Sequence, residues 1–206
     1  MIAIIDYGMG NLRSVEKGFL KVGVDVKVTN KAEDVNDADG VVLPGVGAFK
    51  DCMRELKKLE LIDAVVNSIK TGKPYLGICL GLQVLFSESE EFGKCRGLDI
   101  FRGRVVRFEL DNSELKIPQM GWNQVHIKNN SPLFKEIPDK SYFYFVHSYY
   151  VAPDDDSIIG TTTDYGVEFT SAICIDNVYA VQFHPEKSQA LGLLLLKNFG
   201  EIVYGK

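Results

Sequence analysis

Short apolar or alternating segments are interspersed with amphipathic ones from Met1 to Phe86, and this pattern restricts the possible folds more than any other feature. The apolar or alternating segments are Met1–Ile5, Val24–Val28, Val41–Leu43 and Tyr75–Ile78. Between them, apolar residues recur every three or four positions, which is typical of helices that pack by one face. Strands that alternate with helices predict a parallel sheet with helices on both faces.

The pattern changes after Phe86, where short segments rich in β-branched and aromatic residues are separated by turn residues. These segments are 97–108, 122–128, 142–151, 158–163, 167–175 and 178–183. We expect them to form antiparallel strands added to the sheet, followed by a closing helix over Ser188–Val203. No linker, repeat or low-complexity segment divides the chain. The sequence therefore predicts one α/β domain over residues 1–206, with a mostly parallel central sheet and antiparallel strands in its C-terminal half.

Charge and hydropathy argue against two classes of partner. The net charge is −5 with acidic and basic residues interspersed, so the chain lacks the basic face of a nucleic-acid-binding protein. The longest late apolar run, Leu193–Leu196, is far too short to span a bilayer. The first residues carry no basic leader of the kind that begins a signal peptide. We therefore expect a cytoplasmic protein that binds neither nucleic acid nor membrane.

The four cysteines are scattered, without a C-x-x-C pair or a histidine at metal-ligand spacing. This spacing predicts neither a disulfide framework nor a zinc site, and we expect no metal and no cofactor. The cysteines differ in their surroundings: Cys52 belongs to an amphipathic segment, Cys95 to an expected loop and Cys174 to an expected strand. Only Cys79 has surroundings typical of a reactive thiol.

Cys79 stands in Gly77-Ile78-Cys79-Leu80-Gly81, where the fourth apolar segment passes into an expected helix. Glycines two positions either side of a reactive residue follow the logic of the nucleophile turn, with cysteine in place of serine. Such a turn is sharp and strained, and side chains at the glycine positions would collide with neighbouring backbone. The start of a helix would also favour the thiolate form. A buried structural cysteine between two unrelated glycines is the alternative interpretation.

A thiol nucleophile needs a base, and the base needs a third group that orients it. His184 and Glu186 lie in the segment His184-Pro185-Glu186, just after an alternating strand. Pro185 favours an extended conformation at His184, and residues two apart in an extended chain project to one side. We therefore expect Glu186 to hold the imidazole of His184, although a surface turn would share this sequence. His147 is expected to be a core histidine or a wall of the site.

Attack by a thiolate on an amide passes through an oxyanion, which preorganised N–H groups stabilise. The backbone N–H of Leu80 is one candidate donor. The loop Pro44-Gly45-Val46-Gly47 is another, because its glycines allow bare backbone amides to face an anion. Both segments follow expected parallel strands, so they would meet at the same edge of the sheet. A simple tight turn at residues 44–47 is the alternative.

Together, the P-G-x-G, G-x-C-x-G and H-P-E segments resemble those of the class I glutamine amidotransferases, in the same order and over the whole chain. The resemblance implies a flavodoxin-like α/β fold and hydrolysis of glutamine, with Cys79 as nucleophile, His184 as base and Glu186 as the orienting carboxylate. It also implies an oxyanion site at Gly45, Val46, Gly47 and Leu80. Gln83 matches the glutamine-binding residue of the family.

Three further segments, 6–12, 118–123 and 144–149, resemble those of the glutaminase subunits of imidazole glycerol phosphate synthase. These subunits deliver ammonia to a (β/α)8 cyclase subunit in histidine biosynthesis, and their glutaminase activity is low until the synthase subunit is occupied. The resemblance implies such a heterodimer partner here. The expected interface residues are Asn11, Trp122, Asn123, Tyr149 and Lys187. Exposed aromatic residues are typical of protein interfaces, although Trp122 could also be an ordinary core residue.

Three other functions stay open at the level of sequence. A paralogous glutaminase subunit would use the same chemistry with a different synthase, for instance in surface-sugar synthesis. A stand-alone cysteine hydrolase would need no exposed Trp122. A non-catalytic binding module would retain the fold alone, which the intact Cys79, His184 and Glu186 disfavour.

Overall fold

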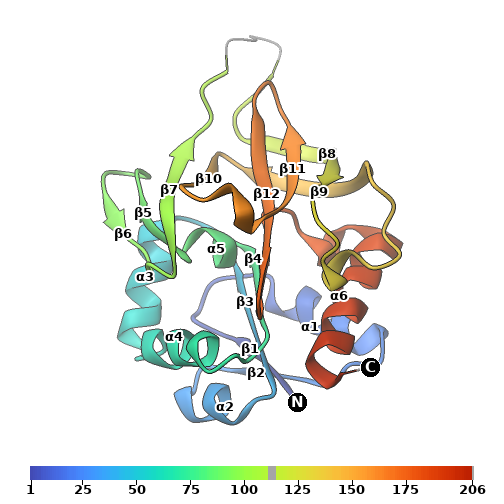
Figure 1. The fold of residues 1–206 in the computed structure, drawn as a ribbon. Coiled ribbons are helices and arrows are strands. Elements are labelled where there is room, and N and C mark those ends of the chain that lie inside the picture. Colours follow the sequence, from blue (N-terminus) through green and yellow to red (C-terminus); the bar gives the residue numbers. More distant parts are fainter. Residues whose placement is uncertain (111–114, 206) are drawn as a thin grey trace.

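The computed structural model describes residues 1–110 and 115–205 and contains a single 13-stranded sheet (Figure 1). The strands are β1 Ile2–Ile5, β2 Val26–Thr29, β3 Gly40–Gly45, β4 Tyr75–Cys79, β5 Phe86–Ser89, β6 Cys95–Arg96, β7 Phe101–Arg107, β8 Gln119–Ile127, β9 Ser141–His147, β10 Tyr149–Pro153, β11 Ile159–Asp164, β12 Glu168–Ile175 and β13 Val178–Val181. The helices are α1 Leu12–Lys21, α2 Ala32–Asp37, α3 Phe49–Lys58, α4 Ile62–Lys70, α5 Leu80–Gln83 and α6 Gln189–Tyr204, with short 3-10 helices η1 Pro132–Phe134, η2 Asp156–Ile158 and η3 Pro185–Lys187.

Five parallel strands form the centre of the sheet in the order β2-β1-β3-β4-β13. The strands β1, β3, β4 and β13 are fully buried, because helices cover both of their faces and the near-continuous apolar sequence suits that position. The prediction of a mostly parallel centre is confirmed. We expected segment 178–183 to be an antiparallel strand, and this was only half right. The strand β13 is antiparallel to β12, but it is parallel to β4 on its other side and belongs to the centre of the sheet.

Alternate residues of the central strands contribute to two hydrophobic clusters, one on each face. In β3, for example, Val41 and Leu43 join the cluster that includes residues of α3 and α4, whereas Val42 joins the cluster that includes residues of α1 and α6. Figure 1 shows these helices on opposite sides of the sheet. Helices on both faces are therefore confirmed. The short helix α2, which was not predicted, ends after only six residues.

The C-terminal half extends the sheet with mostly antiparallel strands, as predicted. The expected strand over 142–151 is instead two strands, β9 and β10, which pair with different neighbours. The strands β5 and β6 were not predicted, and β6 places Cys95 in a strand instead of a loop. β5 pairs parallel with β7, a further departure from the antiparallel pattern.

The register of the central strands aligns three segments of the expected site. Gly45 at the end of β3 lies opposite Cys79 at the end of β4, and Val181 at the end of β13 lies opposite Ile78. The segment 182–186 therefore emerges beside Cys79 at the carboxyl edge of the parallel strands. Ligands bind at this edge in open α/β sheets.

A single continuous sheet supports our proposal that residues 1–206 fold as one domain, although 111–114 and 206 lie outside the described residues. Within residues 1–110 and 115–205, no helix combines the length and hydropathy needed to cross a membrane.

Candidate active site

A cavity of about 250 Å³ opens at the carboxyl edge of β3 and β4. Six of its lining residues were predicted site residues: Val46, Gly47, Cys79, Leu80, Gln83 and His184. The other lining residues are Glu91, Pro118, Val146, His147, Ser148 and Tyr149, of which Tyr149 was predicted for the partner interface instead. Segments that are far apart in the sequence thus meet around one thiol.

The backbone at Cys79 has a φ of 55°, a left-handed conformation that non-glycine residues rarely adopt. The flanking glycines make this turn possible, because a Cβ at Gly77 would overlap the backbone of Gly81 and a Cβ at Gly81 would overlap the carbonyl oxygen of Leu43. The expected strain and crowding are therefore present. The helix that follows, α5, has only four residues, so a helix dipole contributes less to the thiolate than we expected.

His184 and Glu186 form the predicted pair, with 2.9 Å between Nδ1 of His184 and Oε1 of Glu186. Their side chains are 3% and 1% exposed. His184 is extended as expected, but Glu186 lies in the 3-10 helix η3, so a tight turn and not a straight strand brings its carboxylate back to the ring. A carboxylate oxygen accepts, so Nδ1 carries the hydrogen and Nε2 is left for the cavity.

Burial alone would lower the pKa of His184, but the neighbouring Cys79 and Glu186 outweigh it and raise that pKa to about 10. Nε2 of His184 is buried and has no partner in normal hydrogen-bond geometry among the described residues. Catalytic hydrogen bonds are often loose before substrate binds. The imidazole is therefore oriented by Glu186, and its pKa is raised mainly by the neighbouring Cys79.

The predicted oxyanion residues surround the same cavity. Val46, Gly47 and Leu80 line it, and Gly45 stands one position back at the end of β3. Gly47 has a φ of +92°, and a Cβ there would come within 2.7 Å of the Met9 side chain. A Cβ at Gly45 would overlap the Tyr7 hydroxyl oxygen and meet the Leu80 Cβ at 2.6 Å. Glycine is therefore required at both ends of this loop.

The sequence analysis did not assign Gln182 and Glu91 to the site, and it left the role of His147 open. Gln182 is fully buried, and its Nε2 lies 3.5 Å from the Cys79 sulfur. The carboxylate of Glu91 accepts a hydrogen bond from the backbone of Phe49 at 2.6 Å, and burial raises its pKa. His147 is both a buried residue and a wall of the cavity. Burial lowers the pKa of His147 to about 4, so the ring is neutral near pH 7.

The predicted interface residues fall into separate environments. Asn11 is exposed before α1 and makes no side-chain cap. Tyr149 lines the cavity, and the side-chain amide of Asn123 donates to the carbonyl of Asp164 at 2.7 Å. Trp122 and Lys187 meet the same ring, Tyr144: the indole packs edge-on at 6.2 Å and the ammonium lies 5.6 Å from the ring centroid.

Trp122 belongs to an apolar face on the β8–β9 pair, which we call the aromatic face: Met120, Trp122, Tyr142 and Tyr144. Met120, Trp122 and Tyr142 are 64%, 45% and 54% exposed, so Trp122 is not an ordinary core residue. Trp122 stands opposite Tyr144 in the strand register. Exposed apolar patches of this kind mark interaction sites in soluble proteins.

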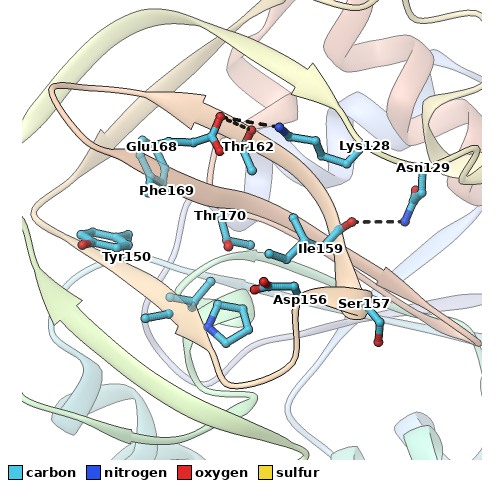
Figure 2. A pocket seen from close by; sticks show the side chains of 13 residues that line it. Lys128, Asn129, Tyr150, Asp156, Ser157, Ile159, Thr162, Glu168, Phe169 and Thr170 are labelled. Carbon is cyan, nitrogen blue, oxygen red and sulfur yellow. Dashed lines mark hydrogen bonds and ion pairs between the residues drawn. The ribbon is translucent and has the colours of Figure 1, made fainter.

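A second, larger cavity of about 740 Å³ lies between β10, β11 and β12, away from Cys79 (Figure 2). Its lining includes Phe169 and Glu168, whose carboxylate pairs with Lys128 and accepts a hydrogen bond from the hydroxyl of Thr162. None of its lining residues is a cysteine or a histidine. The smaller cavity is therefore the candidate active site. In the part of the chain that the structure describes, no cluster of His, Cys, Asp or Glu could hold a metal ion.

The chain is similar to known proteins over almost its whole length. A family model described as "Glutamine amidotransferase class-I" matches residues 3–201. The "Imidazole glycerol phosphate synthase subunit HisH" of Syntrophotalea carbinolica is 55% identical over 206 residues, covering 98% of this chain and 100% of that protein. The HisH subunit of Geobacter sulfurreducens is 55% identical over 205 residues, covering 98% of each.

Solved structures share the fold at lower identity. A glutamine amidotransferase structure aligns with a TM-score of 0.76 at 15% identity, over 100% of both chains. A chain of the PurLQS structure from Thermotoga maritima aligns with a TM-score of 0.74 at 18% identity, over 100% of this chain and 98% of that one. These two likenesses concern the fold alone.

Proposed function

The chain belongs to the class I glutamine amidotransferase family, and from this premise we propose that it hydrolyses glutamine and supplies the ammonia to a (β/α)8 cyclase subunit in histidine biosynthesis. The observation that carries the proposal is the meeting of Cys79, the His184–Glu186 pair and the 45–47 loop at one sheet edge. Relatives 55% identical over nearly the whole chain, both named as synthase subunits, support the partner.

Because Cys79 and Glu186 raise the pKa of His184 to about 10, His184 already holds the proton that Cys79 gives up, and the pair starts as imidazolium and thiolate. The thiolate then attacks the side-chain amide carbon of glutamine, forming a C–S bond and a tetrahedral oxyanion. Collapse of this intermediate breaks the C–N bond, and His184 returns its proton so that ammonia leaves. Water, deprotonated by His184, attacks the γ-glutamyl thioester, and the products are glutamate and the restored thiol. Glu186 keeps the imidazole in one tautomer and stabilises its charged form throughout.

The oxyanion would be held by backbone N–H groups of Leu80 and of the 45–47 loop. Leu80 follows the nucleophile, as in other nucleophile turns. The loop faces the same cavity through Val46 and Gly47. Fixed N–H dipoles in a site with little water stabilise developing charge without having to reorganise.

Two polar residues of the cavity are suited to recognise the α-substituents or amide of glutamine. Both N–H groups of the Gln83 side chain are used within the protein, so its carbonyl oxygen is the atom left to accept from substrate. The Glu91 carboxylate would pair with the α-ammonium group, which would also favour its ionised form against the effect of burial. These roles would distinguish free glutamine from an amide inside a peptide.

The partner would dock on the aromatic face. Trp122 and Tyr144 supply large rigid side chains, and Lys187 offers a positive charge at the rim for an acidic partner residue. Lys187 directly follows Glu186, and Tyr144 accepts the backbone N–H of His184 at 2.9 Å through its carbonyl. A partner seated here would therefore touch the segments that hold the catalytic base.

Ammonia release from glutamine by the purified chain tests the proposal, measured alone and with a candidate cyclase subunit and its substrate. We expect low activity alone, strong stimulation by the occupied partner, and none with Cys79→Ala. Activity in no combination would refute the proposed partner and favour a paralogue with another synthase. Full activity without any partner would favour a stand-alone hydrolase.

A further inference from the structure

Four polar groups form an unbroken hydrogen-bonded chain behind the nucleophile. Nε2 of Gln182 donates to the sulfur of Cys79 at 3.5 Å, and Oε1 of Gln182 accepts from Nε2 of Gln83 at 3.0 Å. Nε2 of Gln83 also donates to the carbonyl oxygen of Tyr149 at 3.0 Å, and Nδ1 of His147 contacts that same oxygen at 2.8 Å. Gln182 and Gln83 are 0% and 3% exposed, so water does not compete for these bonds.

The Tyr149 carbonyl determines the direction of every bond in this chain. A carbonyl oxygen only accepts, so the Gln83 side chain must turn its NH2 group toward Tyr149. The second N–H of that group then points at Gln182, so the side-chain oxygen of Gln182 must accept this hydrogen bond. The NH2 group of Gln182 is thereby turned toward Cys79. The amide orientations therefore follow from a backbone atom and not from a free choice between oxygen and nitrogen.

We propose that Gln182 is a further catalytic residue, whose amide N–H stabilises the thiolate of Cys79, and that Gln83 and the Tyr149 carbonyl are positioning groups that keep this amide in its donating orientation. This inference rests on the proposed role of Cys79 as nucleophile. A hydrogen bond to the charged form of a group favours that form, and the bond is strengthened where solvent is excluded.

The structure explains why this donor is needed. The helix after Cys79 has only four residues and supplies little dipole, while the thiol itself is 6% exposed and poorly hydrated. His184 can charge-pair with the thiolate, but it must give its proton to the leaving ammonia. Gln182 is a second, neutral donor to the sulfur in the thiolate state that precedes the C–S bond, and it does not have to give up its hydrogen.

The test is the pH dependence of Cys79 alkylation by iodoacetamide, measured on the full chain without glutamine or partner. Cys95→Ser serves as background because Cys95 is partly exposed. Burial raises the pKa of the Cys52 and Cys174 thiols to about 12, so neither should react near neutral pH. Gln182→Met removes the donor while keeping the length of the side chain.

Asn198→Leu is the matched control, because Asn198 is also a buried amide whose N–H groups donate to two carbonyls, in α6. We expect Gln182→Met to move the alkylation midpoint upward by about one pH unit, so that the rate at pH 7 falls about tenfold. Asn198→Leu should lower stability and leave the midpoint unchanged. Gln83→Met should give a smaller shift, since the donor remains but its orientation is released.

An unchanged midpoint in Gln182→Met, or an equal shift in Asn198→Leu, would overturn the inference. If Gln182→Met does not fold, Gln83→Met provides the test. An upward shift of its alkylation midpoint supports the proposed chain of hydrogen bonds, and an unchanged midpoint overturns the inference. Ammonia release with the cyclase partner is assayed in parallel on the unsubstituted chain. Failure there would count against the proposed function, whereas the alkylation midpoint tests Gln182 alone.

Discussion

The buried His184, whose pKa is raised by Cys79 first and by Glu186 second, makes the stability of the protein depend on pH in a defined direction. The pKa of His184 in the folded chain is raised to about 10, above its value of about 6.5 in an unfolded chain. A histidine of this kind contributes stability that is fully present below pH ~6.5 and is lost as the pH rises toward about 10.

Glu186→Gln tests this dependence. Removing the carboxylate lowers the pKa of His184 in the folded chain, so the difference in unfolding free energy between wild type and variant should be largest near pH 6 and shrink toward pH 10. Urea unfolding at several pH values measures it. We also expect at least about a 100-fold loss of partner-stimulated glutaminase rate, because the base loses its orienting group. A difference that grows with pH would contradict the assignment.

His147 should act in the opposite direction. Its pKa is lowered to about 4 by burial, so its contribution to stability is complete above pH ~6.5 and is lost as the pH falls toward 4. His147→Gln should therefore flatten the fall in unfolding free energy between pH 6.5 and 4. His126→Gln, which removes a half-buried histidine from β8, controls for the loss of one imidazole. Equal slopes in wild type and His147→Gln would contradict this prediction.

Residues within compact motifs could be predicted from the sequence, and residues that reach the site through tertiary packing could not. Cys79 and His184 stand in segments whose local chemistry is unusual, and Glu186 is only two residues from the ring that it binds. Gln182 and Glu91 have no such signature. Gln182 lies beside Cys79 only because β13 is parallel to β4, whereas the sequence led us to expect 178–183 among the antiparallel strands added to the sheet.

At the scale of elements, the start of α6 holds the segment that carries His184, the proposed base. The Ser188 hydroxyl donates to the carbonyl of His184 at 2.7 Å and accepts the backbone N–H of Tyr144 at 3.0 Å, which ties η3 to β9. A Cβ at Gly192 would overlap the carbonyl oxygen of Pro185. This helix therefore packs directly against the backbone between His184 and Glu186.

Gly192→Ala should displace η3 and lower the glutaminase rate by about tenfold or more, since small misplacements of catalytic groups are costly. Gly200→Ala is the control in the same helix, because its Cβ would meet methyl groups of Val24 and no catalytic backbone. We expect Gly200→Ala to change only the unfolding free energy. Steady-state glutaminase rates and chemical unfolding are measured for both variants. Equal glutaminase rates in Gly192→Ala and Gly200→Ala would show that α6 does not position His184.

The parallel half of the fold was more predictable than the antiparallel half. Strands buried on both faces have near-continuous apolar sequences, and the helices between them have clear periodicity, so β1, β3, β4 and α6 lie where the sequence indicates. In the C-terminal half, strand pairing depends on long-range partners. For example, 142–151 is one aromatic run in sequence but bends at Ser148 to become β9 and β10, on different neighbours.

At the scale of the whole molecule, β9 connects the edge that carries the candidate active site to the aromatic face. Tyr144 packs against Trp122 through its ring and against His184 through its backbone carbonyl, while His147 at the end of the same strand lines the cavity. A partner on the aromatic face could therefore influence the base through one strand. In Figure 1, β8 and β9 lie above α6, and the C-terminus of the chain lies at the lower end of α6.

Trp122→Ala should weaken partner binding and partner-stimulated ammonia release together, because truncation of a central aromatic anchor typically costs about 2 kcal/mol or more, or at least thirtyfold in affinity. The alkylation rate of Cys79 in the isolated chain should not change, since Trp122 does not line the active-site cavity. Tyr204→Ala is the matched control, because Tyr204 is 39% exposed at the end of α6 and lies outside the β8–β9 pair that forms the aromatic face. Titration of the cyclase subunit against each variant measures the affinity.

If binding persists in Trp122→Ala while stimulation of ammonia release is lost, Trp122 transmits the effect of the partner without anchoring it. If neither changes, the partner docks elsewhere and the aromatic face is not the interface.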